Sequence, residues 1–304
     1  MLSNDVARYV DLHRSMGFKF RTQTLLLRSF VTFAERNGDD LVRSARVLEW
    51  AAQAPTPPQR HNRLATVRRF ALAVRAEDLR HEVPPNEAFG RAWFKRCSPH
   101  IYTTEQIADL LRAASSLSPE GSIRPATYTT LFALLAATGL RVSEALALEL
   151  DDFTDDGLMI RATKFRKDRL VPLHQTTRCA LKRYLDQRGR VGSSSSALLI
   201  SLKGTALPYS TVIGTFLSLS RAIGWRPARG HRGPRIHDLR HTFAVRALER
   251  CAGDARAVAR QATALSTYLG HAHVSDTYWY LQATPLLMSQ IAKASETLLN
   301  GGQS

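Results

Sequence analysis

The sequence contains no long apolar run. None of its 304 residues lies in a stretch of the about 18 consecutive apolar side chains that a membrane span requires. The most apolar run, residues 131–137, is short and is bounded by Thr130 and Thr138. No basic segment followed by an apolar one opens the chain, so we also expect no secretory leader. These absences argue against a membrane or exported protein.

Cysteine is scarce as well. Cys97, Cys179 and Cys251 are an odd number and are widely separated, so they predict neither a disulfide framework nor a cysteine metal site. Scattered, unpaired thiols are typical of a reducing compartment, and we therefore expect a cytoplasmic protein.

Acidic residues are few relative to basic ones. The chain has 26 Asp and Glu against 42 Lys and Arg, a formal net charge of +16. A chain this basic is most simply explained by a polyanionic partner, although a soluble protein that is merely basic remains the alternative. Binding to a membrane surface is disfavoured because no basic amphipathic segment flanks an apolar anchor.

The first part of the chain, residues 1–82, has the apolar periodicity of four helices. The fourth places Leu64, Val67 and Phe70 on one face and its arginines mostly off that face. These arginines could form a solvated surface or contact phosphates, and we predict DNA contacts for the following set. The set consists of Arg60, Arg63, Arg68 and Arg69.

Turn-forming residues interrupt the helical pattern over residues 83–100, which we interpret as a linker between two domains. A second domain is expected over residues 101–304, beginning with a capping box formed by Thr103 and Gln106. An apolar helix over residues 126–137 ends at Gly139, and Arg141 follows at the junction with the next helix.

A β-hairpin is predicted next, with strands at residues 158–162 and 169–173. Its loop region carries Lys164, Arg166 and Lys167, and a later basic loop at residues 226–235 carries Arg229 and Arg232. Both loops could contact a phosphate backbone, whereas a disordered surface loop is the alternative for the second. A final helix over residues 284–299 has a narrow apolar stripe that could pack on its own domain or on a neighbouring copy.

Imidazole, guanidinium and phenol groups gather between Arg235 and Tyr280. His237 and Arg240 lie one helical turn apart, and His271 follows the pair Leu269 and Gly270. From these residues alone we infer a phosphate-binding site with a possible tyrosine nucleophile.

A zinc site is the alternative, because His237 and His241 have the spacing of helical zinc ligands. It would need a third ligand from His271 or His273. Asp238, however, stands where that motif wants Glu, and Arg240 inside a zinc pair is electrostatically awkward. We predict no metal and no cofactor.

Five separated elements together resemble the tyrosine recombinase (phage integrase) family. They are the segment 137–144 with Arg141, Lys164 in a hairpin, His237 with Arg240, the Leu-Gly-His segment 269–271, and Tyr280. The resemblance covers residues 101–282 and implies a mainly α fold with a small β-sheet. The helices of residues 1–82 are similar to the family's core-binding domain, so that the two domains would form a clamp on DNA.

The resemblance implies a role for each residue. Arg141, Arg240 and His271 would bind the phosphate oxygens, and Tyr280 would attack to form a covalent 3′-phosphotyrosine. His237 would act as general base or proton shuttle, and Lys164 would protonate the departing 5′ oxygen. Because the phosphotyrosine conserves the energy of the broken bond, neither ATP nor metal is needed.

Several residues compete for these roles. Tyr278 and His273 lie two residues from Tyr280 and His271, but the family spacing favours the latter pair. His241 is interpreted as a helix residue near the site. Glu144 and Asp151 are expected to orient their neighbours, and a purely structural pair of Arg141 with Glu144 is the alternative for that arginine.

The resemblance also implies partners. They are double-stranded DNA and a homotetramer on DNA whose C-terminal helices are exchanged between protomers through Leu287, Ile291 and Leu298. A requirement for a partner recombinase or a DNA-bending protein is left open. It implies a prokaryotic, nucleoid-associated enzyme of integration, excision or transposition. A type IB topoisomerase or resolvase, or a DNA-binding factor without catalysis, remains an alternative.

Overall fold

The chain divides into two compact units, Met1–Cys97 and Ser98–Ser304. The structure is a computed structural model that describes residues 1–90, 98–161, 168–227, 233–251 and 255–270, together with Tyr280 and Ser289. None of the helices in these ranges is long and apolar enough to cross a membrane. The helix expected over residues 284–299 lies outside the described residues apart from Ser289.

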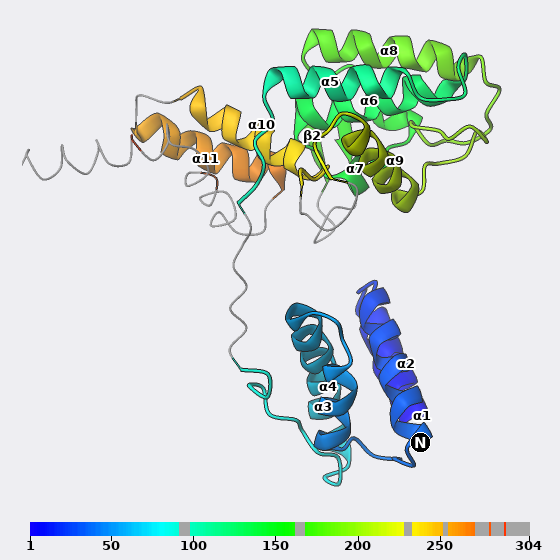
Figure 1. The fold of residues 1–304 in the computed structure, drawn as a ribbon, viewed down its shortest axis with the longest axis vertical. Helices are drawn as coiled ribbons and strands as arrows, with labels where there is room; N and C mark the ends of the chain where they lie inside the picture. The colour runs from blue at the N-terminus through cyan, green and yellow to red at the C-terminus, as the bar shows by residue number, and fades with distance from the viewer. Residues whose placement is uncertain are drawn as a thin grey trace, which may run out of the picture. The chain divides into compact units, whose positions relative to one another are not determined.

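The first unit consists of four helices, which confirms the helical prediction for this region (Figure 1). Each amphipathic segment ends where the sequence stops the helical pattern, and the fourth begins at Pro57, whose fixed φ suits the first helical turn. The helices are α1 (Leu2–Ser15), α2 (Arg21–Arg36), α3 (Ser44–Ala52) and α4 (Pro57–Glu77).

One apolar core holds these helices together. Phe30 and Phe70 are fully buried in it, and Trp50 lies edge-on to Phe30 with ring centroids 5.5 Å apart. Val83 and Phe89 also pack against this core. The first unit therefore takes in much of the segment that we expected to be a linker.

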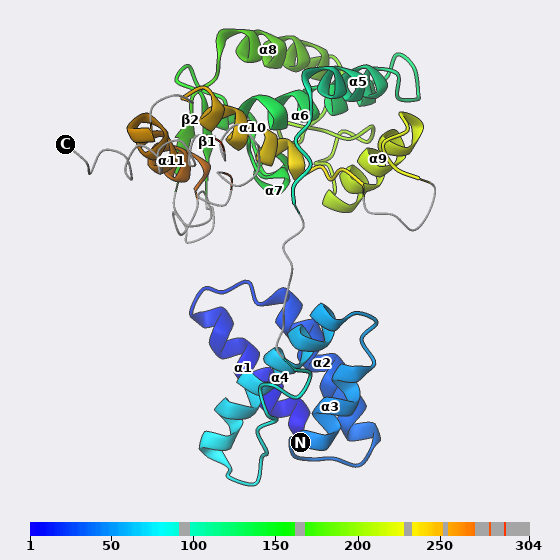
Figure 2. The same cartoon turned by 60° about the vertical axis from the view of Figure 1, so that its left-hand side comes forward.

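The second unit is mainly helical, with α6 in contact with α5, α7, α8 and α10 (Figure 2). α6 is apolar on nearly all sides because these neighbours cover it. The capping box of Thr103 and Gln106 starts α5 as predicted. The elements are α5 (Thr104–Ser115), α6 (Ile123–Thr138), α7 (Val142–Leu146), the 3-10 helix η1 (Leu150–Asp152), α8 (Gln175–Gly189), α9 (Tyr209–Ala222), α10 (Asp238–Glu249) and α11 (Ala255–Leu269).

A two-stranded antiparallel sheet completes this unit. β1 (Leu158–Ile160) pairs with β2 (Arg169–Val171), with Leu158 opposite Val171 and Ile160 opposite Arg169. Both Leu158 and Val171 are buried, so the hairpin is anchored on the core by one face. The expected fold class, mainly α with a small β-sheet, is thereby confirmed.

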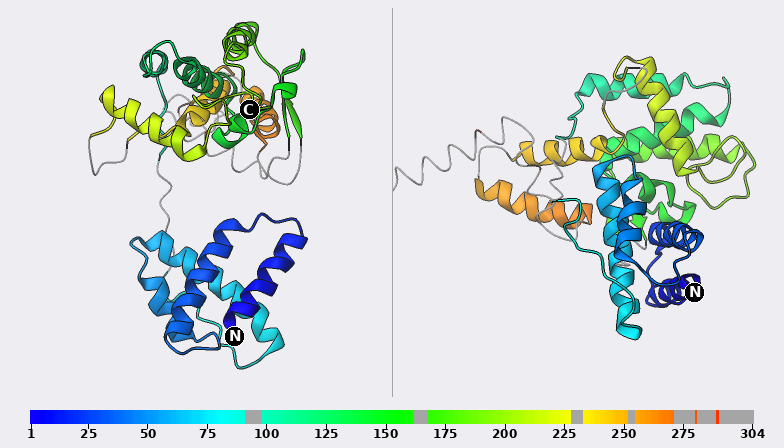
Figure 3. Two further views of the ribbon diagram at one scale, coloured as in Figure 1. Left: turned by 90° about the vertical axis from the view of Figure 1, so that its right-hand side faces the viewer. Right: turned by 60° about the horizontal axis from the view of Figure 1, so that its bottom comes forward.

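A separate apolar cluster joins α10 to α11, which run side by side (Figure 3). Val245 and Leu248 from α10 meet Leu265 and Leu269 from α11, and the ring of Tyr280 is buried among them. This packing fixes the start of α10 close to the end of α11, where the site residues lie.

Candidate active site

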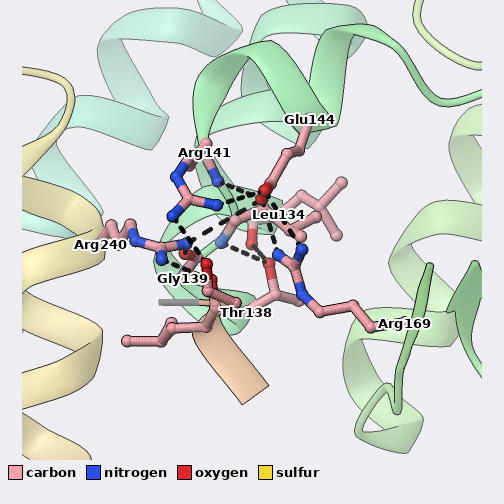
Figure 4. Close-up of polar contacts among 10 residues, drawn as sticks. Leu134, Thr138, Gly139, Arg141, Glu144, Arg169 and Arg240 are labelled. Atoms are coloured by element: carbon pink, nitrogen blue, oxygen red, sulfur yellow. Dashed lines mark hydrogen bonds and ion pairs between the residues drawn. The ribbon is translucent and has the colours of Figure 1, made fainter. Parts of the chain in front are cut away.

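Glu144, on α7, is surrounded by arginines from three elements (Figure 4). Its carboxylate accepts from Arg141 Nη1 at 2.6 Å and from Arg169 Nη2 at 2.7 Å. Arg240 Nη1 on α10 lies 4.0 Å from the same carboxylate. The three arginines with Glu144 are called the guanidinium cluster below. The structural pairing of Arg141 with Glu144, which we had considered an alternative, is therefore present.

The ends of two helices hold the guanidiniums in place. Arg240 donates from Nη1 to the carbonyl of Gly139, at 2.8 Å, and from Nη2 to that of Leu269, at 2.7 Å. Arg141 Nη2 donates to the carbonyl of Gly270 at 3.1 Å. These carbonyls lie at the C-termini of α6 and α11, where the helix dipole is negative and favours a cation.

Gly139 is required where α6 ends. Its φ of +63° is left-handed, and a Cβ there would lie 2.5 Å from Cδ1 of Phe243 on α10. The bare glycine thus lets α10 approach closely enough for Arg240 to reach the Gly139 carbonyl. Gly270, with φ +65°, ends α11 in the same way.

Burial sharpens the electrostatics of the guanidinium cluster. Arg240 is only 2% exposed, and burial, followed by the charge of Arg141, lowers its pKa to about 10, which leaves it charged at neutral pH. Burial works to raise the pKa of Glu144, but hydrogen bonds from Arg169 and Arg141 outweigh it and lower that pKa. One carboxylate thus faces three guanidiniums, and the surplus positive charge suits an anion such as phosphate.

Tyr280 is buried in the α10–α11 cluster with 3% exposure, and its hydroxyl lies 3.2 Å from Nδ1 of His241. Tyr280 also contributes to the electrostatic environment of Arg240. The tyrosine therefore lies at the side of α10 that carries a site arginine and a histidine.

His237 precedes α10, with its ring exposed and its centroid 4.8 Å from that of His241. Although one side faces solvent, the surrounding protein lowers the pKa of His237, and the charge of Arg240 lowers it further. His237 is thus biased toward the neutral form, in which one ring nitrogen can accept a proton.

Metal ligands do not gather in the described ranges, where no three His, Cys, Asp or Glu side chains are close enough together to hold an ion. His271 and His273, from which the third zinc ligand was expected, lie outside those ranges.

Four of the six residues predicted to be catalytic are described, namely Arg141, His237, Arg240 and Tyr280. Lys164 and His271 lie outside the described residues, as do four of the predicted DNA contacts: Arg166, Lys167, Arg229 and Arg232.

Sequence reasoning missed Arg169, and it placed His241 near the site without identifying its contact with Tyr280. Arg169 shares a strand face with the buried Val171, and a charge on a buried face was the available indication that it has a fixed partner. His241 lies one turn after His237 on the same side of α10, which was the corresponding indication for the second histidine.

The four arginines of α4 that were predicted to contact DNA are called the α4 arginines below. Most of them donate hydrogen bonds to main-chain carbonyls outside that helix. Arg60 donates to Ala54 and Arg68 to Pro84. Arg63 donates to the carbonyl of Trp50 at 3.0 Å and lies 4.8 Å above the indole ring. The exposed member, Arg69, donates to the carbonyl of Ala65 in its own helix. Packing within the unit is therefore an additional role, one that we did not anticipate, for three of these four predicted DNA contacts.

Comparison with known proteins identifies the family. Residues 101–286 match the model of the phage integrase family. A Sinorhizobium fredii protein, y4rB, that is named as an integrase/recombinase is 39% identical over 303 residues, which cover 96% of each chain. Tyrosine recombinase XerD of Caulobacter vibrioides is 30% identical over 277 residues, covering 88% of this chain and 86% of that protein.

Solved structures share the fold. The integrase of the transposon Tn1549, in complex with transposon right end DNA, has a TM-score of 0.67 at 16% identity and covers 97% of this chain and 99% of that one. The XerH recombinase bound to its difH substrate has a TM-score of 0.66 at 18% identity, covering 91% of this chain and 79% of that one. A lambda integrase tetramer bound to a Holliday junction is also similar, with a TM-score of 0.59 at 20% identity and coverage of 90% and 77%.

These findings define the class of the protein. The chain belongs to the phage integrase family. It is a tyrosine-type site-specific recombinase, an enzyme of DNA recombination.

Proposed function

We propose that this enzyme breaks and rejoins duplex DNA through a covalent 3′-phosphotyrosine at Tyr280. The observation that carries the proposal is the convergence of Arg141 and Arg240 on the ends of α6 and α11, with Tyr280 packed beside the same α10 helix. A phosphodiester requires charge neutralisation before an oxygen nucleophile can attack it. Two guanidiniums, the buried one of Arg240 and the partly exposed one of Arg141, supply that charge permanently.

Each predicted residue keeps its role in this proposal. Arg141 and Arg240 bind the non-bridging oxygens, with His271 as a further donor. His237 stands at the rim of the site, where a neutral imidazole can shuttle protons. Lys164, from the loop between β1 and β2, protonates the departing 5′ oxygen. Glu144 positions Arg141, because its carboxylate accepts a hydrogen bond from that guanidinium. Arg169 donates to the same carboxylate and so holds it in place.

DNA binding is proposed to involve both units. The XerH, Tn1549 and lambda proteins are each named in complex with DNA, the last as a tetramer, and the net charge of +16 suits the same partner. Residues 1–82 and 101–304 would then clamp the duplex across the segment 83–100. Arg69, Arg166, Lys167, Arg229 and Arg232 would contact phosphates, together with any remaining donors of Arg60, Arg63 and Arg68.

Strand exchange between two sites is proposed to occur in a homotetramer in the cytoplasm, at the nucleoid. The apolar stripe of residues 284–299 would join the protomers, and replacing Leu287, Ile291 and Leu298 with Ser would weaken assembly on DNA while sparing single-site binding. Integration, excision or transposition of a mobile element is the corresponding biological task.

The decisive experiment traps and sequences the DNA joined to the protein. Wild type and Tyr280→Phe are incubated with fragmented host DNA and denatured, and covalently bound DNA is recovered and sequenced. Tyr278→Phe is the matched control, because it removes a neighbouring phenol. We expect a discrete set of sequences from wild type and Tyr278→Phe and none from Tyr280→Phe. An adduct that survives in Tyr280→Phe would overturn the proposal.

A further inference from the structure

The hydroxyl of Tyr280 contacts His241, a residue that has no role in the proposed reaction so far. Its oxygen lies 3.2 Å from Nδ1 of His241, with the two rings tilted by 57°. The His241 side chain is 13% exposed and Tyr280 is 3% exposed. Phenol and imidazole thus meet where little water can exchange protons with either group.

The other nitrogen of His241 faces a carboxylate. Nε2 lies 4.0 Å from Oδ1 of Asp238, which is 1% exposed. Asp238 is held in turn by Arg235, whose Nη2 donates to Oδ1 at 2.7 Å and whose main-chain N–H donates to Oδ2 at 2.8 Å. A carboxylate on this side favours the tautomer with its proton on Nε2. The lone pair is then on Nδ1, and the phenol donates to it.

His241 is neutral when the site is at rest. Burial, followed by the charge of His237, lowers its pKa to about 4, and the guanidiniums of Arg235 and Arg240 act in the same direction. Asp238 is the one group acting to raise it among those that affect His241 in the described part of the chain. A neutral imidazole can accept a proton, and an incoming phosphodiester anion would raise its pKa toward the range of a useful base.

We propose that His241 accepts the proton of Tyr280 as the phenol attacks the phosphodiester, with Asp238 as its positioning residue. The inference rests on the proposed function and deepens it. The O–H bond of Tyr280 breaks and its proton passes to Nδ1, while the phenolic oxygen bonds to phosphorus. The bond from phosphorus to the 5′ oxygen breaks, and that oxygen takes a proton from Lys164. In the return step a 5′-hydroxyl gives its proton to the now neutral Lys164 and bonds to phosphorus. The bond from phosphorus to the Tyr280 oxygen breaks, and His241 gives its proton back to that oxygen.

His237 is thereby relieved of the first proton transfer. His237 is exposed, and its ring centroid lies 4.8 Å from that of His241. In this proposal His241 accepts the proton of the nucleophile, whereas His237 shuttles protons at the exposed rim of the site.

The tautomer of His241 can be tested without DNA. Nitrogen NMR of the full-length protein labelled with ¹⁵N-histidine distinguishes a protonated from an unprotonated ring nitrogen, and His241→Gln assigns the resonance. We expect the proton on Nε2 at pH 7, and a shift toward the other tautomer in Asp238→Asn. A proton on Nδ1 would overturn the proposal, because Tyr280 would then be the acceptor.

The catalytic role is tested on the DNA recovered in the trapping experiment. General-base loss costs roughly 10²–10⁴-fold, so His241→Gln should slow adduct formation by about that factor with DNA affinity unchanged. His174→Asn is the matched control, because His174 caps α8 through Thr176 and Asn keeps that cap. Adduct formation at the wild-type rate in His241→Gln would overturn the role.

A DNA substrate with a bridging sulfur distinguishes the proton taken from Tyr280 from the proton given to the leaving 5′ oxygen. In a duplex with sulfur in place of the scissile 5′ oxygen, the leaving thiolate needs no acid, so the defect of Lys164→Ala should be relieved and that of His241→Gln should persist. Relief of the His241→Gln defect would place this histidine on the leaving group and overturn the proposal. A wild type that forms no adduct on any DNA overturns the proposed function, and the catalytic role with it. A proton on Nδ1 overturns the proposal for His241 but leaves the phosphotyrosine at Tyr280 untouched, so the two failures are distinguishable.

Discussion

The α4 arginines of the first unit and the guanidinium cluster of the second use the same side chain in different ways. On α4, Arg60, Arg63 and Arg68 each donate to one carbonyl of a nearby segment. In the guanidinium cluster the arginines also donate to carbonyls, but three of them converge on the single carboxylate of Glu144. The first arrangement ties helices together, whereas the second concentrates positive charge.

Exposure and the number of nearby charges distinguish arginines that stabilise the fold from arginines that can bind an anion. A half-exposed guanidinium remains hydrated, and its contact with a carbonyl adds modest stability. Three guanidiniums around one carboxylate, of which that of Arg240 is buried and those of Arg141 and Arg169 are partly exposed, leave positive charge that an arriving anion can balance. Net charge alone does not reveal this distinction, and each of the following experiments tests it.

The largest expected effect is on chemistry, from Arg240→Lys. Lysine keeps one charge but cannot donate at once to Gly139, Leu269 and a phosphate, so we expect adduct formation to fall by about 10²–10³-fold, the usual cost of one transition-state donor. Single-turnover cleavage of the recovered DNA measures it. Arg63→Lys in the first unit is the matched control and should cleave normally once bound. Equal losses of cleavage rate in both variants would show that the arginines of the guanidinium cluster and of α4 do not differ in this way.

Glu144→Gln should have the next largest effect, on stability. It removes the charge that Arg141 and Arg169 share, and breaking a buried ion pair costs about 3–5 kcal/mol. Urea unfolding with hydrogen exchange at α7 and α10 measures the loss. Glu77→Gln removes the partner of Arg8 in an exposed pair on the first unit, for which little or no loss of stability is expected because solvent screens the pair. A loss at Glu144 as small as that at Glu77 would show that the cluster is not electrostatically tight.

The pH dependence of stability should reveal the buried histidine. The pKa of His241 is lowered from 6.5 to about 4 in the folded protein, so the unfolded chain binds the proton more readily. The contribution of neutral His241 to the free energy of unfolding is therefore fully present above pH 6.5 and is lost as the pH falls toward 4. The loss amounts to at most about 3 kcal/mol. His237, whose pKa is also lowered, acts in the same direction.

His241→Gln should therefore flatten the plot of unfolding free energy against pH between 6.5 and 4, as measured by urea titrations at several pH values. His174→Asn, at an exposed position, should leave the slope unchanged. Identical slopes for wild type and His241→Gln would mean that this histidine is not held neutral by the fold.

The smallest expected effect is that of Arg63→Ala. Losing the hydrogen bond to Trp50 and the contact with its ring should cost about 1–2 kcal/mol, measured by hydrogen exchange in α3 and α4. Arg69→Ala is the matched variant on the same helix. It should change stability by less than about 0.5 kcal/mol but flatten the salt dependence of DNA binding by about one phosphate contact. The opposite assignment of the two effects would reverse the roles of these arginines.

Much of the fold could be predicted because its causes are local. The apolar periodicity of α1 to α4, the capping box of α5 and the glycine that ends α6 each act within a few residues. The hairpin was predicted from two short apolar runs, although β1 and β2 are shorter than expected. The packing of Val83 and Phe89 on the first core was not predicted, because turn-forming residues say nothing about what a loop covers.

The site could be predicted in part. Arg141, His237, Arg240 and Tyr280 were predicted from the family resemblance and its spacing, and their roles remain predictions. Arg169 and the partner of His241 were not, because these contacts join segments distant in sequence.

The sequence by itself determined the helices, the hairpin, the basic charge and the residue types of a phosphate site, since each depends on composition or short-range pattern. The tertiary structure alone decided which arginine meets Glu144, which helix ends receive Arg240, and which imidazole faces the hydroxyl of Tyr280. Those pairings depend on the distance between α6, α10 and α11, and packing sets that distance, down to the missing Cβ of Gly139 against Phe243.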